Sequence, residues 1–344
     1  LSLDKDRTRL REALEQIDEY STYLDRDEFE SFSIDSHQEY EGIGVSLLQS
    51  AEGVEIRQVF ASSPALQAGL RVGDIITRIN GYDVRDWDFS QVVEEIRGSR
   101  GTRLRMSVVR NGEFLDFTLN RGFINIPSVR DTHLTDDGIL YLKIDQFGEK
   151  TAREFLQQIS PYVTRPLKGL VIDLRENTGG VFRTSVDLLD AFYKRGEVML
   201  KTREVDEREF RPLFAHHRDP LRNLPTVVLV NRNTASAAEI VAGSLQATGR
   251  AVVIGEQTLG KGSIQTVYSL RSGDAYKRTT GYYYLPNGAS IDKEGITPDI
   301  EIELDNNGYL EYRRTELDGM PAYQREDPFW VAATRIIRGS SARG

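Results

Sequence analysis

Two residues of this chain, Ser236 and Lys261, are of the types that cleave acyl bonds, and they lie 25 residues apart. A serine hydroxyl attacks a carbonyl once a neighbouring base takes its proton, and a neutral lysine amine can be that base. Ser236 follows a buried-strand pattern at 226–230 and a polar turn, and a helix-periodic stretch begins directly after it. Because a helix N-terminus favours developing negative charge, the N–H of Ala237 is a candidate oxyanion donor.

Each of these residues also has a purely structural interpretation. Ser236 and Glu239 have the spacing of a capping box, in which the two side chains complete the first turn of a helix. Lys261 lies between Gly260 and Gly262, which allow close approach to a neighbouring backbone, although a loop lysine is usually solvated. On these two segments alone, the catalytic and the structural interpretations both stay open.

The segment from Gly255 to Lys261 also comes close to a nucleotide-binding P-loop. Such a loop requires Ser or Thr directly after its lysine to reach magnesium, and this chain has Gly262 there. Residues 264–270 then alternate like a strand, whereas a P-loop opens a helix. The sequence therefore disfavours a phosphate-binding loop.

Composition excludes several classes of function. The 344 residues are 39% hydrophobic and 28% charged, which is enough for two domains with proper cores. A net charge of -9 disfavours binding to nucleic acid or to an anionic membrane, and favours peptides or small molecules as partners. The chain has no cysteine and its four histidines lack ligand spacing, so we expect no disulfide, no metal and no cofactor.

No apolar run approaches the roughly 20 residues that cross a bilayer. The sequence begins at Leu1, which is compatible with removal of a signal or anchor segment. The compartment therefore cannot be read directly from the residues.

Four regions are predicted along the chain. Residues 1–38 form a mostly polar helical arm, 40–120 a compact inserted domain, 122–304 an α/β core, and 305–344 a C-terminal extension that packs on the core or on a partner. In the arm, an apolar stripe is expected to dock on the protein itself, with a second subunit as the alternative. The stripe consists of Leu10, Leu14 and Ile17.

Within 122–304, buried-strand runs alternate with helical patterns. The expected strands are 140–144, 169–174, 226–230 and 251–254, and the expected helices are near 150–160, 181–194 and 236–248. The turn that follows strand 169–174 ends in Gly179 and Gly180, whose N–H groups can face the same point as that of Ala237. A Gly-Gly pair also serves simply to make a tight turn.

Residues 40–120 resemble a PDZ domain. The resemblance is carried by Ser63-Pro-Ala-x-x-Ala-Gly69-Leu-x-x-Gly-Asp74-x-Ile-x-x-Ile-Asn-Gly81-x-x-Val84 and by a hairpin turned at Asn111-Gly112. A PDZ domain binds a C-terminal peptide as an added strand, with the terminal carboxylate on the backbone N–H groups of a glycine turn. The resemblance thus implies Gly42, Ile43, Gly44 and Val45 as the cradle. Val92, Val93 and Ile96 would line the side-chain pocket, although we expect at least one of them to be ordinary core.

Three further segments, together with this domain, resemble the carboxyl-terminal processing peptidase family over roughly residues 15–304. They are Leu170-Val-Ile-Asp-Leu-Arg-Glu-Asn-Thr-Gly-Gly180, Thr234-Ala-Ser-Ala-Ala-Glu-Ile-Val-Ala-Gly243 and Gly260-Lys-Gly-Ser-Ile-Gln265. The resemblance implies a crotonase-like or ClpP-like α/β core. It also implies Ser236 as nucleophile, Lys261 as base, Gln265 as the residue that orients the base, and Ala237 with Gly180, or the adjacent Gly179, as oxyanion donors. Thr178 and Ala238 depart from the family pattern, but neither replaces a catalytic group.

Burial of the base is a chemical requirement of this assignment. At pH 7.5 a lysine of ordinary pKa is only about 0.1% neutral, so an apolar environment must lower that pKa. A glutamine amide oxygen can accept a hydrogen bond from the amine, whereas a carboxylate there would favour the ammonium form. The alternative base is His216 or His217, which lie in a charged stretch typical of a surface loop.

The expected function is therefore hydrolysis of protein substrates near exposed, apolar C-terminal tails, with the PDZ domain as a tether or as an activating gate. The family resemblance favours the gate, and it implies a periplasmic or other extracytoplasmic location and an adaptor protein in some cases; a homo-oligomer is compatible with it. The alternative is a non-catalytic PDZ scaffold with a decayed peptidase core, which the presence of all three catalytic residue types disfavours.

Overall fold

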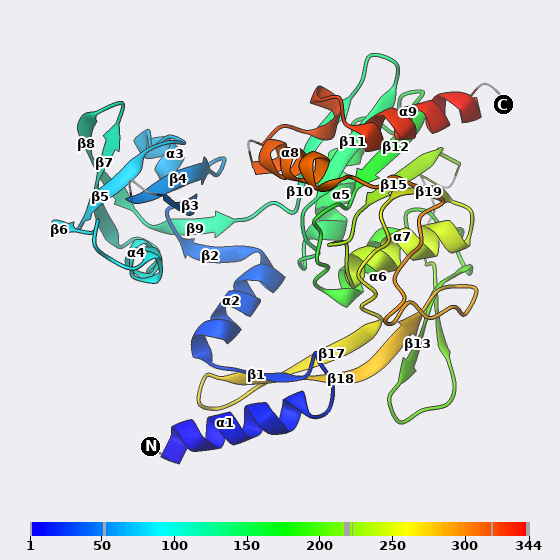
Figure 1. Ribbon diagram of the computed structural model, residues 1–344, viewed down its shortest axis with the longest axis horizontal. Coiled ribbons are helices and arrows are strands. Elements are labelled where there is room, and N and C mark those ends of the chain that lie inside the picture. Colours follow the sequence, from blue (N-terminus) through cyan, green and yellow to red (C-terminus); the bar gives the residue numbers. More distant parts are fainter. Residues whose placement is uncertain (1, 51–52, 217–220, 222, 318, 342–344) are drawn as a thin grey trace. The chain divides into compact units, whose positions relative to one another are not determined.

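The computed structural model describes residues 2–50, 53–216, 221, 223–317 and 319–341, which divide into two compact units (Figure 1). One unit is the continuous segment Gln38–Ile126. The other combines Leu1–His37 with Pro127–Gly344, so the N-terminal segment belongs to the same unit as the α/β core.

The unit Gln38–Ile126 is built on an antiparallel sheet with the strand order β3-β4-β5-β7-β8, in which β6 pairs with β5. Its strands are β3 (Val45–Ser50), β4 (Gly53–Val59), β5 (Ile75–Ile79), β6 (Tyr82–Asp83), β7 (Arg103–Arg110) and β8 (Glu113–Asn120). A separate ribbon pairs β2 (Glu39–Gly42) with β9 (Gly122–Asn125), and the helices are α3 (Pro64–Ala68) and α4 (Phe89–Ile96).

Local signals in the sequence account for this unit. Ser63 caps α3 by accepting the N–H of Leu66 at 3.1 Å, and Gly69 ends the helix with a φ of 90°. At the β7–β8 turn, Asn111 and Gly112 have φ values of 51° and 83°, as a tight hairpin turn requires. Apolar residues from the strands and from α4 then form a single core between the helices and the sheet.

The main sheet of the other unit has the order β10-β11-β12-β15-β16-β19. Its strands are β10 (Val129–Leu134), β11 (Ile139–Ile144), β12 (Gly169–Asp173), β15 (Thr226–Val230), β16 (Ala251–Gly255) and β19 (Ile300–Glu301). β10 runs antiparallel to β11, and the remaining pairs are parallel. The strands expected at 140–144, 169–174, 226–230 and 251–254 are therefore the centre of this sheet.

Helices cover both faces of the main sheet, which explains why its strands read as continuous apolar runs. Alternate residues such as Leu140, Ile172 and Val228 pack in one core with α5 (Thr151–Ile159), α6 (Phe182–Leu189) and α7 (Ala237–Ala247). α6 ends at Leu189, earlier than the expected limit of 194, because the chain turns at Asp190, whose carboxylate accepts the N–H of His216 at 2.7 Å.

The opposite face of the main sheet packs against the C-terminal segment. This segment contains α8 (Asn306–Leu317), the short 3-10 helix η1 (Ala322–Gln324) and α9 (Pro328–Ser341). Phe329, Ala333 and Ile337 of α9 are buried against strand residues that include Tyr141 and Val171, and α9 lies mainly over β15 and β16. The C-terminal extension is thus part of the core of this unit.

A second, antiparallel sheet combines one strand of the N-terminal segment with strands from later parts of the α/β unit. It contains β1 (Thr22–Leu24), β13 (Val198–Glu204), β14 (Arg211–Phe214), β17 (Ser263–Ser269) and β18 (Ala275–Tyr284). β1 lies between α1 (Ser2–Glu15) and α2 (Arg26–His37) and pairs with β18. Of the expected apolar stripe, Leu14 is buried, whereas Leu10 and Ile17 are 37% and 52% exposed.

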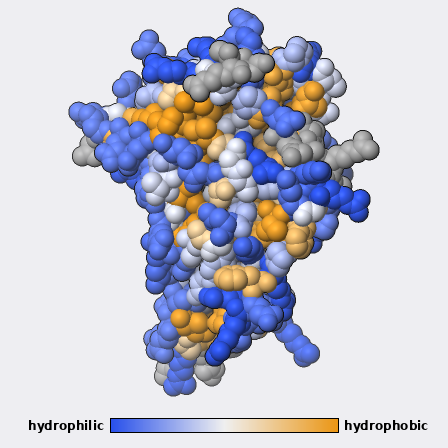
Figure 2. Space-filling view, turned by 90° about the vertical axis from the view of Figure 1, so that its right-hand side faces the viewer, coloured by the Kyte–Doolittle hydropathy of each residue, from blue (hydrophilic) through white to orange (hydrophobic). Residues whose placement is uncertain are grey.

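The described surface is predominantly polar on the face shown in Figure 2, where apolar side chains form several separate patches. Among the helices of the described residues, none has the length and apolar character needed to cross a membrane.

Candidate active site

Ser236 lies on a strained turn between β15 and α7. Its φ of 54° and ψ of -116° fall outside the ordinary regions for a residue with a side chain, and such strain is typical of functional turns. The backbone N–H of Ser236 donates to the carboxylate of Glu239 at 2.8 Å. The turn therefore holds the serine at the N-terminus of α7, as the sequence predicts.

The loop after β12 packs directly against this turn. Gly179 has a φ of 97°, and a Cβ atom there would come within 2.7 Å of Ser236 Cβ and 2.9 Å of Ala237 N. Gly180 has a φ of 136°, and a Cβ there would lie 2.1 Å from the carbonyl oxygen of Phe147. Both positions therefore need glycine, because a side chain would push the loop away from the serine.

The two glycines differ in whether their N–H groups are free to donate a hydrogen bond. The N–H of Gly179 donates to Asn177 Oδ1 at 2.9 Å, so it is already engaged. Within the described part of the chain, the N–H groups of Gly180 and Ala237 have no hydrogen-bond partner. Gly180 and Ala237 thus carry the two N–H groups beside Ser236 that are free to bind a negative oxygen.

Lys261 lies in an environment that favours its neutral form. Burial lowers the pKa of Lys261, and the nearby charge of Lys277 lowers it further, against the opposing effects of Glu239, Asp18 and Glu19. The amine nitrogen lies 4.7 Å from the ring centroid of Tyr20, and the described residues include no hydrogen bond from this nitrogen to Ser236 Oγ. Hydrogen bonds between catalytic groups are often longer in the absence of substrate than in the reacting complex.

The buried carboxylate of Glu239 joins the serine turn to the lysine loop. Besides Ser236 N–H, it accepts the N–H groups of Gly260 at 2.7 Å and of Lys261 at 2.9 Å, and the hydroxyl of Thr258 at 2.5 Å. Glu239 is fully buried, and a carboxylate offers about four acceptor sites, so these four donors match its capacity. Glu239, which the sequence indicates as a partner in a capping box, therefore bonds to both loops. The sequence did not indicate its bonds to the lysine loop.

Tyr283 of β18 makes a second connection between the two loops. Its hydroxyl donates to the carbonyl oxygen of Ser236 at 3.1 Å and also contacts that of Lys261. Tyr283 is almost fully buried, and burial raises the pKa of its hydroxyl well above the usual value, so it stays a donor. Neither Tyr20 nor Tyr283 was predicted, because each comes from a strand or turn distant in sequence.

Gln265 lies on β17, and the structure does not place it in a hydrogen bond with Lys261. Its amide nitrogen donates to Ser263 Oγ at 2.8 Å and to Thr279 Oγ1 at 3.3 Å. These bonds orient the amide and leave its oxygen as the group available to a donor.

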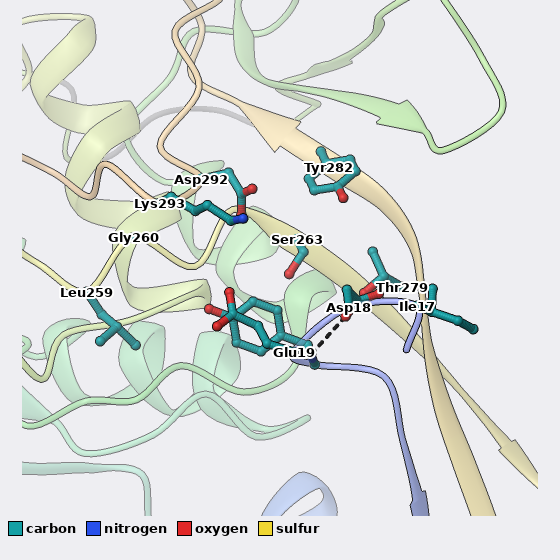
Figure 3. A pocket seen from close by; sticks show the side chains of 11 residues that line it. Ile17, Asp18, Glu19, Leu259, Gly260, Ser263, Thr279, Tyr282, Asp292 and Lys293 are labelled. Atoms are coloured by element: carbon teal, nitrogen blue, oxygen red, sulfur yellow. Dashed lines mark hydrogen bonds between the residues drawn. The ribbon is translucent and has the colours of Figure 1, made fainter. Parts of the chain in front are cut away.

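A cavity of about 960 Å³ adjoins the lysine loop (Figure 3). Three parts of the chain line it: the segment before β1, the loop that leads into β17, and residues on and after β18. Asp18 accepts the N–H of Tyr20 at 2.8 Å, which fixes the turn that places Tyr20 in the cavity wall. The lining residues are Ile17, Asp18, Glu19, Tyr20, Leu259, Gly260, Ser263, Thr279, Tyr282, Asp292 and Lys293.

The alternative base is not supported by this geometry. His216 is exposed beyond β14, where its backbone N–H bonds to Asp190, and none of its described contacts involves Ser236. His217 lies outside the described residues. Within the described residues there is also no group of three metal-ligating side chains, and the sequence contains no cysteine.

In the unit Gln38–Ile126, the side chain of Tyr40 lies against the predicted carboxylate cradle. Gly42, Ile43 and Gly44 are buried, and Val45 begins β3. The ring of Tyr40 lies so close to Gly42 that a Cβ there would be 2.8 Å from Tyr40 Cε2. Burial raises the pKa of the Tyr40 hydroxyl, while the charge of Arg97 and backbone hydrogen bonds from Val45 and Gly44 act in the opposite direction.

The three residues predicted to line the side-chain pocket lie on α4. Val92 and Ile96 are 0% and 5% exposed and belong to the core of their unit. Val93 is half-buried. At least two of the three thus pack as ordinary core residues, in line with the expectation for at least one.

Comparison with known proteins places both units in described families. Residues 138–302 match the family model described as peptidase family S41, and residues 31–109 match that of the PDZ domain. A carboxy-terminal-processing protease of Bartonella bacilliformis is 34% identical over 293 residues, covering 83% of this chain and 67% of that protein. The carboxy-terminal processing protease CtpA of Bacillus subtilis is 31% identical over 311 residues, covering 90% and 65%.

Solved structures agree with this placement. The photosystem II D1 C-terminal processing protease aligns with a TM-score of 0.50 and 26% identity, covering 87% of this chain and 83% of that one. A putative S41 protease from Bacteroides fragilis has the same fold, with a TM-score of 0.60 at 19% identity over 93% and 86% of the two chains.

The chain spans about two thirds of the length of the two curated relatives, 67% and 65%. The chain belongs to peptidase family S41, among the carboxy-terminal-processing proteases that carry a PDZ domain.

Proposed function

We propose that the protein is a serine peptidase that cleaves protein substrates near their C-termini, with Ser236 as nucleophile and Lys261 as general base. The observation that carries the proposal is the double connection between the two loops. Glu239 and Tyr283 each bond to both Ser236 and Lys261, so the backbones of nucleophile and base are held as one unit. The lowered pKa of Lys261 supports its role as a proton acceptor.

The proposed reaction is acyl transfer. Ser236 Oγ attacks the scissile carbonyl while the neutral Lys261 amine takes its proton, and the N–H groups of Gly180 and Ala237 stabilise the negative oxygen. The Lys261 ammonium then protonates the leaving amine, and a water molecule hydrolyses the acyl-enzyme. Gln265 orients the amine through its amide oxygen, which stays available because its nitrogen is bound by Ser263 and Thr279.

The PDZ unit is proposed to bind the apolar C-terminal tail of a substrate and to gate the peptidase rather than merely tether its substrate. The glycine turn Gly42–Val45 would hold the tail carboxylate, and β3 would pair with the tail as an added strand. The names of the relatives support tail-directed cleavage. An extracytoplasmic location, an adaptor that delivers substrates, and self-association are proposed on the family resemblance alone.

A direct test measures the mass of a model protein's C-terminus after incubation with the enzyme. We expect the wild-type protein to shorten an apolar tail, and Ser236→Ala and Lys261→Ala to lower the rate by about 10⁴-fold or more, as for members of other catalytic triads.

A double variant, His216→Gln with His217→Gln, is the control and should keep wild-type cleavage. Survival of cleavage in Lys261→Ala, with loss in the histidine variant, would instead assign the base to the histidines. If no folded form of the wild-type protein cleaved any tail, the peptidase proposal would be wrong.

A further inference from the structure

Arg175 lies two residues after the end of β12 and is a fully buried cation. It stands at the start of the loop that leads from β12 to the two glycines of the site, which we call the oxyanion loop. Its guanidinium forms a two-pronged pair with Asp173, with N–O distances of 2.9 and 2.6 Å. The remaining nitrogen, Nη1, lies 2.7 Å from Asp327 Oδ2, which comes from the residue just before α9. The rings of Tyr312 and Phe329, also from the C-terminal segment, lie on the guanidinium at 4.9 Å each.

Charge at this cluster depends on Asp327. Asp173 and Asp327 are the two carboxylates that pair with Arg175; Asp327 also pairs with Arg325, and the charge of Lys143 acts on Asp173 and on Asp131. Burial alone would raise the pKa of Asp173, but the charges of Arg175 and Lys143 outweigh it, and the pKa is lowered. Neutralising Asp327 would leave Arg175 with one of its two carboxylates, and buried charges without full pairing force the surrounding structure to rearrange.

The cluster is joined covalently and by hydrogen bonds to the oxyanion loop. The carbonyl oxygen of Arg175 accepts from Lys143 Nζ at 3.1 Å, and four residues later the chain reaches Gly179. Glu176, the next residue after Arg175, has a φ of 66° and exchanges hydrogen bonds with Asn231 at 3.0 and 2.7 Å. A displaced Arg175 would therefore move the loop that carries Gly179 and Gly180.

α8 makes further contacts with the oxyanion loop and with the loop between β15 and α7, which carries the serine. Arg313 pairs with Glu176 at 2.6 Å, and Tyr309 accepts a hydrogen bond at its hydroxyl from Asn233 at 3.2 Å. Glu176 precedes the oxyanion glycines, whereas Asn233 precedes Ser236. The C-terminal segment thus contacts both halves of the site from the face of the main sheet opposite α5, α6 and α7.

We propose that Asp327 is a positioning residue: by pairing with Arg175 it fixes the oxyanion loop, with Tyr309 and Arg313 as weaker supports. The inference rests on the proposed peptidase function. Because oxyanion donors act on the transition state, a displaced loop lowers kcat more than it raises KM.

The principal variant is Asp327→Asn, which removes the charge and nearly preserves the shape. We expect kcat for cleavage of a C-terminally tailed model peptide to fall by at least about tenfold, with KM within about twofold, as small displacements of a site can cost about 10²-fold. Affinity for a peptide boronate, which forms a tetrahedral adduct with a serine, should fall in parallel. Should Asp327→Asn not fold, the double variant Tyr309→Phe with Arg313→Gln tests the same loops, with a loss of about threefold or more in kcat.

Ile337→Ala, on the helix that begins directly after Asp327, is the matched control. Ile337 is fully buried against Gly169, at the start of β12, whereas Arg175 follows the end of that strand. This variant loosens α9 without touching Arg175, and its kcat should stay within about twofold of wild type at a temperature where all variants remain folded.

A second measurement does not require activity. In amide NMR spectra of the full chain, the Gly179 and Gly180 signals should shift or broaden in Asp327→Asn and stay in place in Ile337→Ala. The inference is wrong if these signals do not move in Asp327→Asn, if its kcat is unchanged, or if Ile337→Ala loses as much kcat. A wild-type chain that cleaves nothing would refute the peptidase function instead, and the NMR result would still decide whether Asp327 positions the loop.

Discussion

The lowered pKa of Lys261 makes a prediction about the dependence of cleavage on pH. A general base works only when neutral, so kcat/KM should rise with pH through the pKa of Lys261 and then level off. Because burial lowers that pKa below the usual value of 10.5, the rise should be complete at a lower pH than for a solvated lysine. A pH profile of kcat/KM measures the midpoint.

The neighbouring charges allow this midpoint to be moved in both directions. Lys277→Gln removes a positive charge that lowers the pKa of Lys261, so the midpoint should move to higher pH. Glu19→Gln removes a negative charge that raises the pKa, so the midpoint should move to lower pH. Lys293→Gln makes the same change of charge as Lys277→Gln in the wall of the adjoining cavity, and Lys293 is not among the largest influences on the pKa of Lys261. A profile in which neither Lys277→Gln nor Glu19→Gln moves the midpoint would exclude Lys261 as the titrating base.

The two glycines beside Ser236, Gly179 and Gly180, lead to a second prediction at this scale. Gly179→Ala would place a methyl group 2.7 Å from Ser236 Cβ on a backbone with a φ of 97°. We expect kcat to fall by about 10²-fold, since displacement of the serine or the loop by about 1 Å can have that effect. Gly138→Ala, at a φ of 85° with no contact closer than 3.6 Å, is the control for backbone strain alone. Equal losses in the two variants would show that crowding at the serine is not the cause.

The candidate site was predictable from sequence at some residues and not at others. Ser236, Lys261 and the Gly179-Gly180 turn stand beside strands and helices with clear periodicity, so their types and positions could be read together. The bonds of Glu239 to Gly260 and Lys261 could not, because a capping box explains the same residue with local contacts only. Tyr20 and Tyr283 carry no local signal, since a tyrosine in or beside a strand usually packs in a core.

Among the elements, α7 and the loop before β17 depend on each other through Glu239. A glutamine in its place keeps one acceptor oxygen and turns an NH₂ group toward backbone donors, so at least one pair of donors would face each other. For Glu239→Gln we expect a loss of about 2–4 kcal/mol in the free energy of unfolding, as for other disrupted buried polar networks, and about 10²-fold in kcat. Chemical denaturation and steady-state kinetics measure the two effects.

Thr258→Val separates the loss of one donor to Glu239 from the loss of the network. It removes the hydroxyl that donates to Glu239 at 2.5 Å and accepts the N–H of Ile296 at 2.7 Å, and it leaves the three backbone donors to Glu239 in place. Its loss should be about 1–2 kcal/mol, with kcat within a few-fold of wild type. Equal effects of the two variants would mean that Glu239 does not connect the two elements beyond that single bond.

The elements themselves follow the sequence where the signals are local. The strands β11, β12, β15 and β16 lie where apolar runs of four to six residues predict them, and the Asn111-Gly112 hairpin follows its turn chemistry. β1 is only three residues long and pairs with β18 about 250 positions away, so no periodic pattern identifies it. The end of α6 was misplaced because Ala191, Phe192 and Tyr193 continue an apolar pattern after the helix has stopped, and they fill the core from a turn.

For the whole molecule, the position of Tyr40 beside the cradle of the PDZ unit bears on how a substrate tail is recognised. If the Tyr40 hydroxyl takes the backbone donors of Gly44 and Val45, a tail carboxylate must compete with it. Tyr40→Phe keeps the ring against Gly42 and removes the competing oxygen. We expect affinity for an apolar peptide with a free C-terminus to rise by about three- to tenfold, the value of one hydrogen bond of about 1 kcal/mol.

The measurement uses calorimetry on the inactive Ser236→Ala chain, with the same peptide in amidated form as a control. The amide should gain nothing from Tyr40→Phe, because it lacks the carboxylate. In the active chain, gating predicts that Tyr40→Phe also raises the cleavage of tailed substrates, whereas a rise in binding without a rise in cleavage would favour a simple tether.

The buried pair of Arg175 and Asp327 has a consequence for the order of events during synthesis. Arg175 leaves the ribosome 152 residues before Asp327, together with its partner Asp173 but without its second carboxylate. A nascent chain that already contains Ser236, Gly179 and Gly180 therefore lacks the second carboxylate of Arg175 until the residue before α9 has been made. Under the role proposed for Asp327, the loop that carries these glycines takes its final position only after that point in synthesis, and a chain that stopped before Asp327 would not reach it.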